Sequence, residues 1–324
     1  MNRLLKTFSD YYNQQDFRLF LNSLAQKVYE ALGTSYSNSD GEVKIVTDLC
    51  KAIDGESYNK RLNFHAKKIH DSRSFVEFHN QNRLTTKELA DMVIISIATK
   101  DREIVFEKTA FIQNKKEDAE KNTWKIDQDQ LYLLHNFPTF KGQKGIFKKN
   151  FTDEVIFQNY SESLGNYGLF QSPGEMILVN ALTVFRLQQG DKISFSDIRK
   201  YPNTQNNVFS FPLIDYPFWD EMLYRYFKHF PKYGFPLLNL PFLGNNIISF
   251  NVYEFIRNWS LFNIGEVVSI GDKVANYDLR NFNRTLLHSV GLSNSINLRT
   301  EKQQYESDDD LVILVAHINL DEKE

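Results

Sequence analysis

The chain has 324 residues, of which 42% are hydrophobic and 24% charged, with a formal net charge of −3. This composition is ordinary for a folded protein, and the length predicts two domains. The net charge argues against a protein whose whole surface binds nucleic acid. One cysteine, Cys50, excludes an intrachain disulfide, and no apolar stretch approaches the ~20 residues that span a bilayer. We therefore expect a cytoplasmic protein with no membrane partner.

The residues before position 80 predict helices followed by a strand. Residues 16–32 carry apolar side chains at helical spacing, and the helix is expected to stop at Gly33. Residues 43–53 predict a second helix and residues 59–69 a third, which carries or adjoins several lysines and an arginine. Residues 74–79 then predict the first strand.

Two apolar runs of strand length follow, separated by a short polar break. Residues 88–97 read ELADMVIISI and residues 104–116 read IVFEKTAFIQNKK, which predicts a β-hairpin. In an antiparallel pair the start of one strand lies beside the end of the other. Because side chains alternate faces along a strand, Gln113 and Lys115 point the same way, and we expect Asp91 to meet both.

After the hairpin, residues 126–137 predict a helix that stops before Pro138. Further along, the segment Ser172-Pro173-Gly174-Glu175 has the residue order of a helix start, and the helix is expected to continue to Leu187. The remaining predicted elements are a helix at 219–230, a helix at 253–262 and a buried strand at 310–320.

The motif of Asp91, Gln113 and Lys115 resembles that of the PD-(D/E)XK nuclease superfamily, which places an Asp on one strand and (Glu/Asp)-x-Lys on the next. The Gln in the second part is similar to the Gln-x-Lys variant of Mrr-type restriction enzymes. The resemblance covers residues 60–137. It implies an α/β fold with a restriction-endonuclease-like core, a mixed sheet flanked by helices, over residues 1–150. A mainly helical, aromatic-rich C-terminal region over residues 151–324 would recognise the substrate or a partner.

The resemblance also implies a site and a cofactor. Asp91 and Gln113 would be ligands of Mg²⁺ or Mn²⁺, which take oxygen donors and keep several waters. Lys115 would be the catalytic lysine, positioning the attacking water or stabilising the developing negative charge. Because Gln carries no charge, a further carboxylate would strengthen metal binding. The candidates for it are Glu30, Glu77, Glu88 and Glu107.

The expected function is that of a metal-dependent DNA endonuclease in bacterial restriction or anti-phage defence. It would act alone, as an oligomer or with a second protein of the defence system. Salt-dependent contacts to DNA phosphates are assigned to Lys67, Lys68, Arg73, Lys116, Lys141 and Lys144. One alternative is a nuclease-fold protein of weak or no activity that binds nucleic acid or a partner subunit. In another interpretation the motif has no function: Asp91 is an ordinary residue at the start of a strand, and residues 113–117 are a solvated polar stretch.

Overall fold

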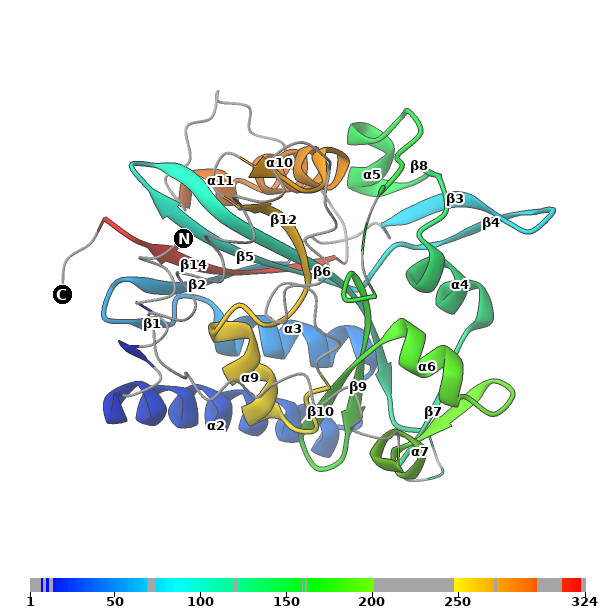
Figure 1. Ribbon diagram of the computed structural model, residues 1–324. Coiled ribbons are helices and arrows are strands. Elements are labelled where there is room, and N and C mark those ends of the chain that lie inside the picture. The colour runs from blue at the N-terminus through cyan, green and yellow to red at the C-terminus, as the bar shows by residue number, and fades with distance from the viewer. Residues whose placement is uncertain are drawn as a thin grey trace.

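The computed structural model describes residues 7, 10, 11, 14–68, 74–118, 120, 122–158, 160, 162–200, 248–270, 273–295 and 311–321. Within these residues a nine-stranded mixed sheet forms the centre, and helices cover both of its faces (Figure 1). Smaller sheets of three and two strands stand beside it. The prediction of a mixed sheet flanked by helices is therefore confirmed at this level.

The central sheet draws its strands from the whole length of the chain. They are β1 (Ser57–Tyr58), β2 (Leu62–Lys68), β5 (Met92–Lys100), β6 (Glu103–Lys116), β9 (Gly165–Gln171), β10 (Glu175–Asn180), β12 (Glu266–Ile270), β13 (Lys273–Val274) and β14 (Val312–Asn319). Their order is β1-β2-β14-β5-β6-β12-β13, with β9 and β10 continuing from β6. The sheet thus crosses the boundary expected between residues 150 and 151.

Two pairings in this sheet determine where the candidate site lies. β5 and β6 form the predicted antiparallel hairpin, with Met92 opposite Ile112. β6 then pairs in parallel with β9, from Phe111 opposite Gly165 to Lys116 opposite Phe170. The last residues of β6 therefore lie beside the start of β5 and at the carboxyl end of a parallel strand pair.

Both faces of the sheet are buried, which explains the continuous apolar run of β5. Alternate side chains of β5, such as Ile94 and Ile95, enter two separate hydrophobic clusters. The helices α2 (Gln15–Ser37), α3 (Glu42–Ile53) and α9 (Val252–Ser260) pack on one face. The other helices are α4 (Gln128–Asn136), α5 (Gly145–Asn150), α6 (Ala181–Leu187), α7 (Phe195–Lys200), α10 (Tyr277–Ser289) and α11 (Leu292–Ser295).

The predicted helices at 43–53, 126–137 and 253–262 form as α3, α4 and α9, and the buried strand at 310–320 forms as β14. The predicted helix at 16–32 forms as α2 but continues past Gly33 to Ser37. A Cβ atom at Gly33 would lie 3.0 Å from the carbonyl oxygen of Pro173, so this glycine permits close packing and does not end the helix. The helix predicted at 219–230 lies outside the described residues.

The helix predicted at residues 59–69 is wrong, because this segment forms strand β2. Leu62, Phe64 and Ala66 are buried while the residues between them are partly exposed, a period of two that belongs to a strand. The strand predicted at 74–79 does form, as β3 (Phe75–Asn80). It pairs with β4 (Arg83–Glu88) and β8 (Phe140–Gly142) in the three-stranded sheet, so it is not a neighbour of the hairpin.

The helix predicted from Ser172 to Leu187 is also largely wrong. Residues 172–174 form the turn between β9 and β10, and Glu175 begins a strand instead of a helix. The helix α6 begins only at Ala181, where the Asn180 side chain accepts a hydrogen bond from the Thr183 backbone and caps it. The described part of the chain beyond residue 150 is therefore mixed in structure and not mainly helical.

Candidate functional site

Asp91 is held at the start of β5 by the two neighbouring strands. Its backbone N–H donates to the Ile112 carbonyl at 3.1 Å, and its carbonyl accepts from the Val312 N–H at 3.0 Å. Its side-chain Oδ2 accepts hydrogen bonds from Gln113 Nε2 at 2.5 Å and from the Asn114 backbone N–H at 2.6 Å. The structure thus brings Asp91 and Gln113 together, as the hairpin register predicts.

The surroundings of Asp91 favour its protonated form. Burial, and then the negative charge of Glu88, raise the pKa of the Asp91 carboxyl to about 7, although the Asn114 N–H and the positive charge of Lys115 act against the shift. The nearby Glu42 carboxylate also raises this pKa. Near neutral pH the carboxyl is therefore poised between its two states, so a bound cation would favour the ionised state.

Lys115 meets a carboxylate that the sequence did not point to. Its Nζ lies 3.4 Å from Oε2 of Glu42, and Oε1 of Glu42 accepts a 2.9 Å hydrogen bond from the Lys116 backbone. Glu42 is the first residue of α3 and directly precedes the predicted helix at 43–53. The helix start was visible in the sequence, but its packing against the end of β6 depends on tertiary structure.

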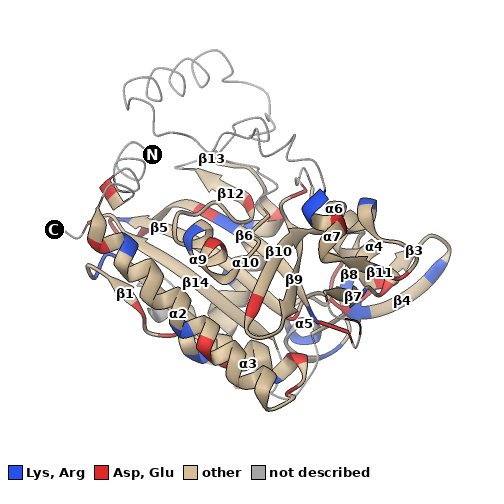
Figure 2. Ribbon diagram, turned by 90° about the horizontal axis from the view of Figure 1, so that it is seen from below, with Lys and Arg blue, Asp and Glu red and all other residues tan. Residues whose placement is uncertain are grey.

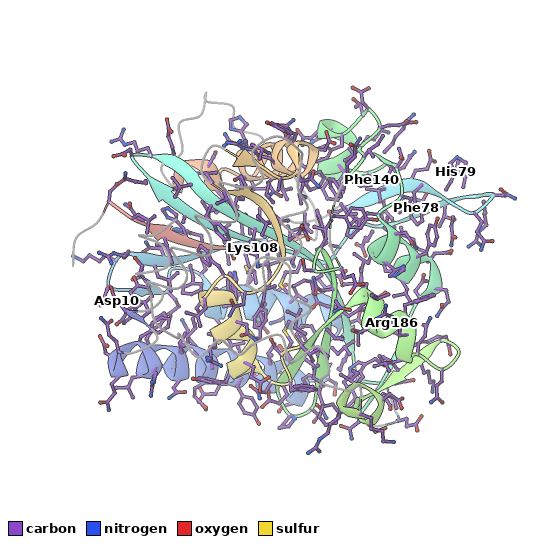
Figure 3. All side chains as sticks on the ribbon, viewed as in Figure 1. Asp10, Phe78, His79, Lys108, Phe140 and Arg186 are labelled. Atoms are coloured by element: carbon purple, nitrogen blue, oxygen red, sulfur yellow. The ribbon has the colours of Figure 1, made fainter. Side chains whose placement is uncertain are left out.

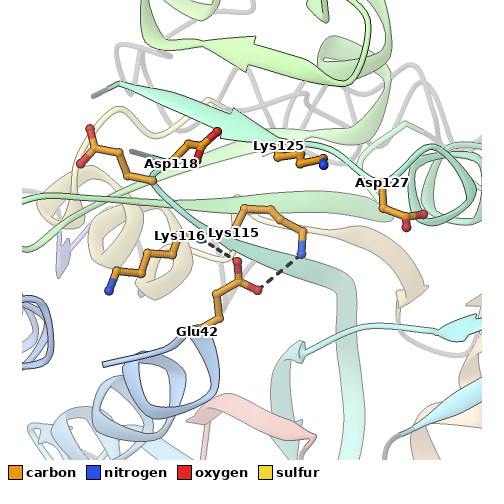
Figure 4. Close-up of a pocket in the computed structure, with 7 residues that line it drawn as sticks. Glu42, Lys115, Lys116, Asp118, Lys125 and Asp127 are labelled. Carbon is orange, nitrogen blue, oxygen red and sulfur yellow. Dashed lines mark hydrogen bonds and ion pairs between the residues drawn. The ribbon is translucent and has the colours of Figure 1, made fainter. Parts of the chain in front are cut away.

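A pocket of about 390 Å³ opens at this end of β6 (Figure 4). Its lining combines three lysines with four carboxylates: Glu42, Lys115, Lys116, Glu117, Asp118, Lys125 and Asp127. Ligands of open α/β sheets bind outside the carboxyl ends of parallel strands, which is where this pocket lies. Both α3 and α4 begin at its wall, where Glu42 is the first residue of α3 and Asp127 is the N-cap of α4.

Asp91 and Gln113 have the donor atoms that a hard cation requires. The Nε2 atom of Gln113 faces the Asp91 carboxylate, and its buried Oε1 has no hydrogen-bond partner among the described residues. Neither Asp91 nor Gln113 is among the residues that line the pocket. Among the described residues, no group of three or more His, Cys, Asp or Glu is arranged to hold a metal ion. Asp91 and Gln113 are the residues at this site that could contribute oxygen ligands to a cation.

The four candidate carboxylates lie in different places. Glu88 acts on Asp91 through its charge, whereas Glu30 accepts a hydrogen bond from Gln26 one turn earlier in α2. Glu77 belongs to the three-stranded sheet. Glu107 is fully buried on β6, about 20 Å before Gln113 at the rise of a strand.

The candidate DNA-binding residues are partly brought together. Lys67 and Lys68 are the last residues of β2. On the neighbouring strand β14, Val312 pairs with Lys68 on one side and with Met92, the residue after Asp91, on the other. Lys116 lines the pocket, and its Nζ donates to the Asp40 carbonyl at 2.6 Å. Lys141 is on β8 of the three-stranded sheet, and Lys144 follows that strand. Arg73 lies outside the described residues.

A second polar cluster is buried beneath α10. Asn283 Nδ2 donates to Glu107 Oε1 at 2.6 Å and to Thr109 Oγ1 at 2.5 Å. Among the described residues, Glu107 Oε2 and Asn283 Oδ1 have no hydrogen-bond partner. The same holds for Oγ of Ser269, which stands opposite Glu107 on β12. Burial raises the pKa of Glu107 to about 7.

The neighbouring Lys108 points to the other face of the sheet, near the centre of the molecule (Figure 3). Its Nζ donates to the Asn263 carbonyl at 3.4 Å. Burial lowers the pKa of Lys108 to about 8, and the charge of Glu266 acts against this shift.

No described helix is long and apolar enough to cross a membrane. Comparison of the chain with protein-family models, curated proteins and solved structures finds no match. The interpretation of the site therefore depends on its own geometry.

Proposed function

We propose that this protein is a metal-dependent endonuclease that hydrolyses phosphodiester bonds in DNA, as part of bacterial restriction or anti-phage defence. The observation that carries the proposal is the convergence of Asp91, Gln113, Lys115 and Glu42 at one end of β6, beside an open pocket. Glu42 adds a second carboxylate to a motif that supplied only one. Glu42 holds Lys115 and is not a proposed metal ligand, so its support for the enzyme is that it fixes the proposed catalytic lysine.

Each residue has a chemical role in this proposal. Asp91 and Gln113 Oε1 would hold Mg²⁺ or Mn²⁺, which when bound would polarise a phosphate and acidify a coordinated water. Lys115 would stabilise the negative charge that develops on the phosphate. Glu42 fixes the ammonium group of Lys115 at a distance of 3.4 Å, so it is a positioning residue. The DNA backbone would follow Lys116 and the neighbouring lysines.

A specific observation also supports the alternative of a nucleic-acid- or partner-binding subunit. Oδ2 of Asp91 already accepts two hydrogen bonds within the protein, and the described residues supply no group of three candidate ligands among His, Cys, Asp and Glu. Such a protein would use the same pocket and lysines without cleaving its ligand.

An assay of supercoiled plasmid cleavage in the presence of Mg²⁺, Mn²⁺ or EDTA distinguishes the nuclease from the binding subunit. The variants are Asp91→Ala and Lys115→Ala, with Lys51→Ala as a control at an exposed position of α3 away from the pocket. The nuclease predicts metal-dependent nicking that the two site variants abolish and the control retains. Metal-independent binding without nicking supports the binding subunit, and nicking that survives in both site variants would refute the site.

A further inference from the structure

The ribbon of β3 and β4 extends beyond the rest of the fold, as both views show (Figures 1 and 2). β8 pairs with β3 up to Phe78, so only the part of the ribbon beyond Phe78 is two-stranded. Strands β3 and β4 pair from Phe75 opposite Glu88 to Asn80 opposite Arg83, and Gln81 and Asn82 form the turn between them. One face of the ribbon is buried by Val76 and Phe78. The other face carries exposed side chains, including His79, Leu84 and Thr86.

The tip of the ribbon is rich in side chains that read base edges. Gln81, Asn82 and Arg83 are exposed, and together with Asn80 they line an open hollow of about 410 Å³. Asn and Gln side chains pair with adenine in the major groove. The groove, about 12 Å wide, admits a two-stranded ribbon. Shape and chemistry at this tip therefore match the same partner.

The ribbon is fixed to the body by the first turn of α4. Arg83 Nη2 contacts both carboxylate oxygens of Asp129, at 2.6 and 2.7 Å, and Asn80 Nδ2 donates to the same group at 2.9 Å. Lower on the same face, Lys87 pairs with Asp127 at 2.6 Å. These contacts hold the tip in one orientation, which reduces the entropy lost on binding, and leave Gln81 and Asn82 as the outermost amides.

The ribbon also leads directly to the candidate site. The chain from Gln81 to Asp91 spans at most about 33 Å at ~3.3 Å per residue, which corresponds to about ten base pairs of duplex DNA at ~3.4 Å each. Beside the ribbon, Lys141 stands opposite Glu77, and Lys144 Nζ lies 5.2 Å from the centre of the Phe75 ring. The side chains of Lys148 and Lys149 on α5 are exposed as well. These lysines lie on the β8 side of the ribbon, where Lys141 also pairs with Glu154 at 3.5 Å, and they match the charge of one phosphate backbone.

We propose that the β3–β4 ribbon enters the major groove of duplex DNA and that Gln81 and Asn82 read base edges within about ten base pairs of the cleaved bond. This inference rests on the proposed function and deepens it, because it assigns the substrate to duplex DNA and specificity to the ribbon tip. The flanking lysines supply affinity that does not depend on sequence.

The test is selection of bound sequences from a randomised duplex library by the full chain in EDTA, followed by mapping of the cleavage positions with Mg²⁺. The variant is Gln81→Ala/Asn82→Ala. The control is Gln15→Ala/Gln26→Ala, which removes two amides from α2, at the other side of the molecule. For the ribbon variant, each lost base contact should reduce the preference for the selected motif over random duplex roughly five- to one-hundredfold. Its affinity for random duplex, which depends on salt, should change less than twofold.

The outcomes separate this inference from the proposed function. Enrichment of a motif by the wild type and the control, lost in the ribbon variant, supports the ribbon. Cleavage without any sequence preference, or a preference that the ribbon variant retains, overturns the ribbon while the nuclease stands. Absence of both duplex binding and cleavage by the wild type overturns both.

Discussion

Replacing Glu107 by glutamine should stabilise the protein at alkaline pH. Glu107 is fully buried, and Asn283 donates to its Oε1, while Glu107 Oε2 and Asn283 Oδ1 both lack a partner. A proton on Oε2 would satisfy both atoms, because the acid would then donate to the amide oxygen. The Gln side chain carries a permanent N–H donor and can make the same pair without a proton.

The magnitude follows from the pKa of Glu107, which burial raises from 4.5 to about 7 against the opposing effects of the Asn283 hydrogen bond and of Arg284 and Arg280. The folded state keeps a proton that the unfolded chain releases, so this contribution to stability is complete below pH 4.5 and is lost as pH rises through 7. At about 1.4 kcal/mol per pKa unit, the ionised side chain costs about 3 kcal/mol at pH 8. The E107Q variant avoids this cost.

Urea denaturation at pH 5 and pH 8 measures the difference, with Glu103→Gln, an exposed glutamate at the start of the same strand, as the control. We expect E107Q to exceed the wild type in unfolding free energy by about 3 kcal/mol at pH 8 and by less than ~1 kcal/mol at pH 5. The control should change neither value. An equal gain at both pH values, or a loss at pH 8, would refute the acid–amide pair.

Three further predictions concern the site and its support. Asp91→Asn should abolish cleavage. It should also raise the unfolding free energy of the metal-free protein at pH 8, because the pKa of Asp91 is raised to about 7 and the ionised carboxyl is then unfavourable in the folded state. For the wild type, the Mn²⁺ affinity measured by calorimetry should rise as the pH increases from 5 to 7, and an affinity independent of pH would contradict this. Glu42→Gln should lower kcat at least tenfold without altering the melting temperature. A lower melting temperature together with a lower kcat would indicate that the contact between Glu42 and Lys115 is structural. Gly165→Ala should lower the unfolding free energy by about 2 kcal/mol, because the new Cβ would lie 2.0 Å from a carbonyl oxygen of α4. Thermal denaturation measures the loss. The control is Gly41→Ala, because a Cβ at Gly41 meets nothing within 4 Å.

The parts of the fold that local pattern determines were predictable from the sequence. The β5–β6 hairpin follows from two apolar runs, and its register alone places Asp91 beside Gln113. The helix α4 is bounded by Asp127 as its cap and by Pro138 after its end. These features depend on neighbours in the sequence, so no knowledge of the tertiary structure was needed.

The missed features depend on contacts between distant segments. Leu62, Phe64 and Ala66 alternate as in a strand, but the charged residues around them favoured a helix, and only pairing with β14 identifies the strand. Glu42 reaches Lys115 because α3 packs under β6, which no local pattern reveals. Residues 172–174 carry the signals of a helix start but serve the β9–β10 turn, because the strand that follows pairs with β9.

Strand β14 bears on when the protein can become active during its synthesis. It lies between β2 and β5, which both end by Lys100, and it pairs with each along seven or eight residues. The Val312 N–H also bonds the carbonyl of Asp91, so the backbone of the candidate metal ligand is completed from far along the chain. A nascent chain that lacks residues 312–319 therefore has neither the strand that joins β2 to β5 nor the Val312 hydrogen bond to Asp91. The sheet around the candidate site is completed only when β14 has been synthesised.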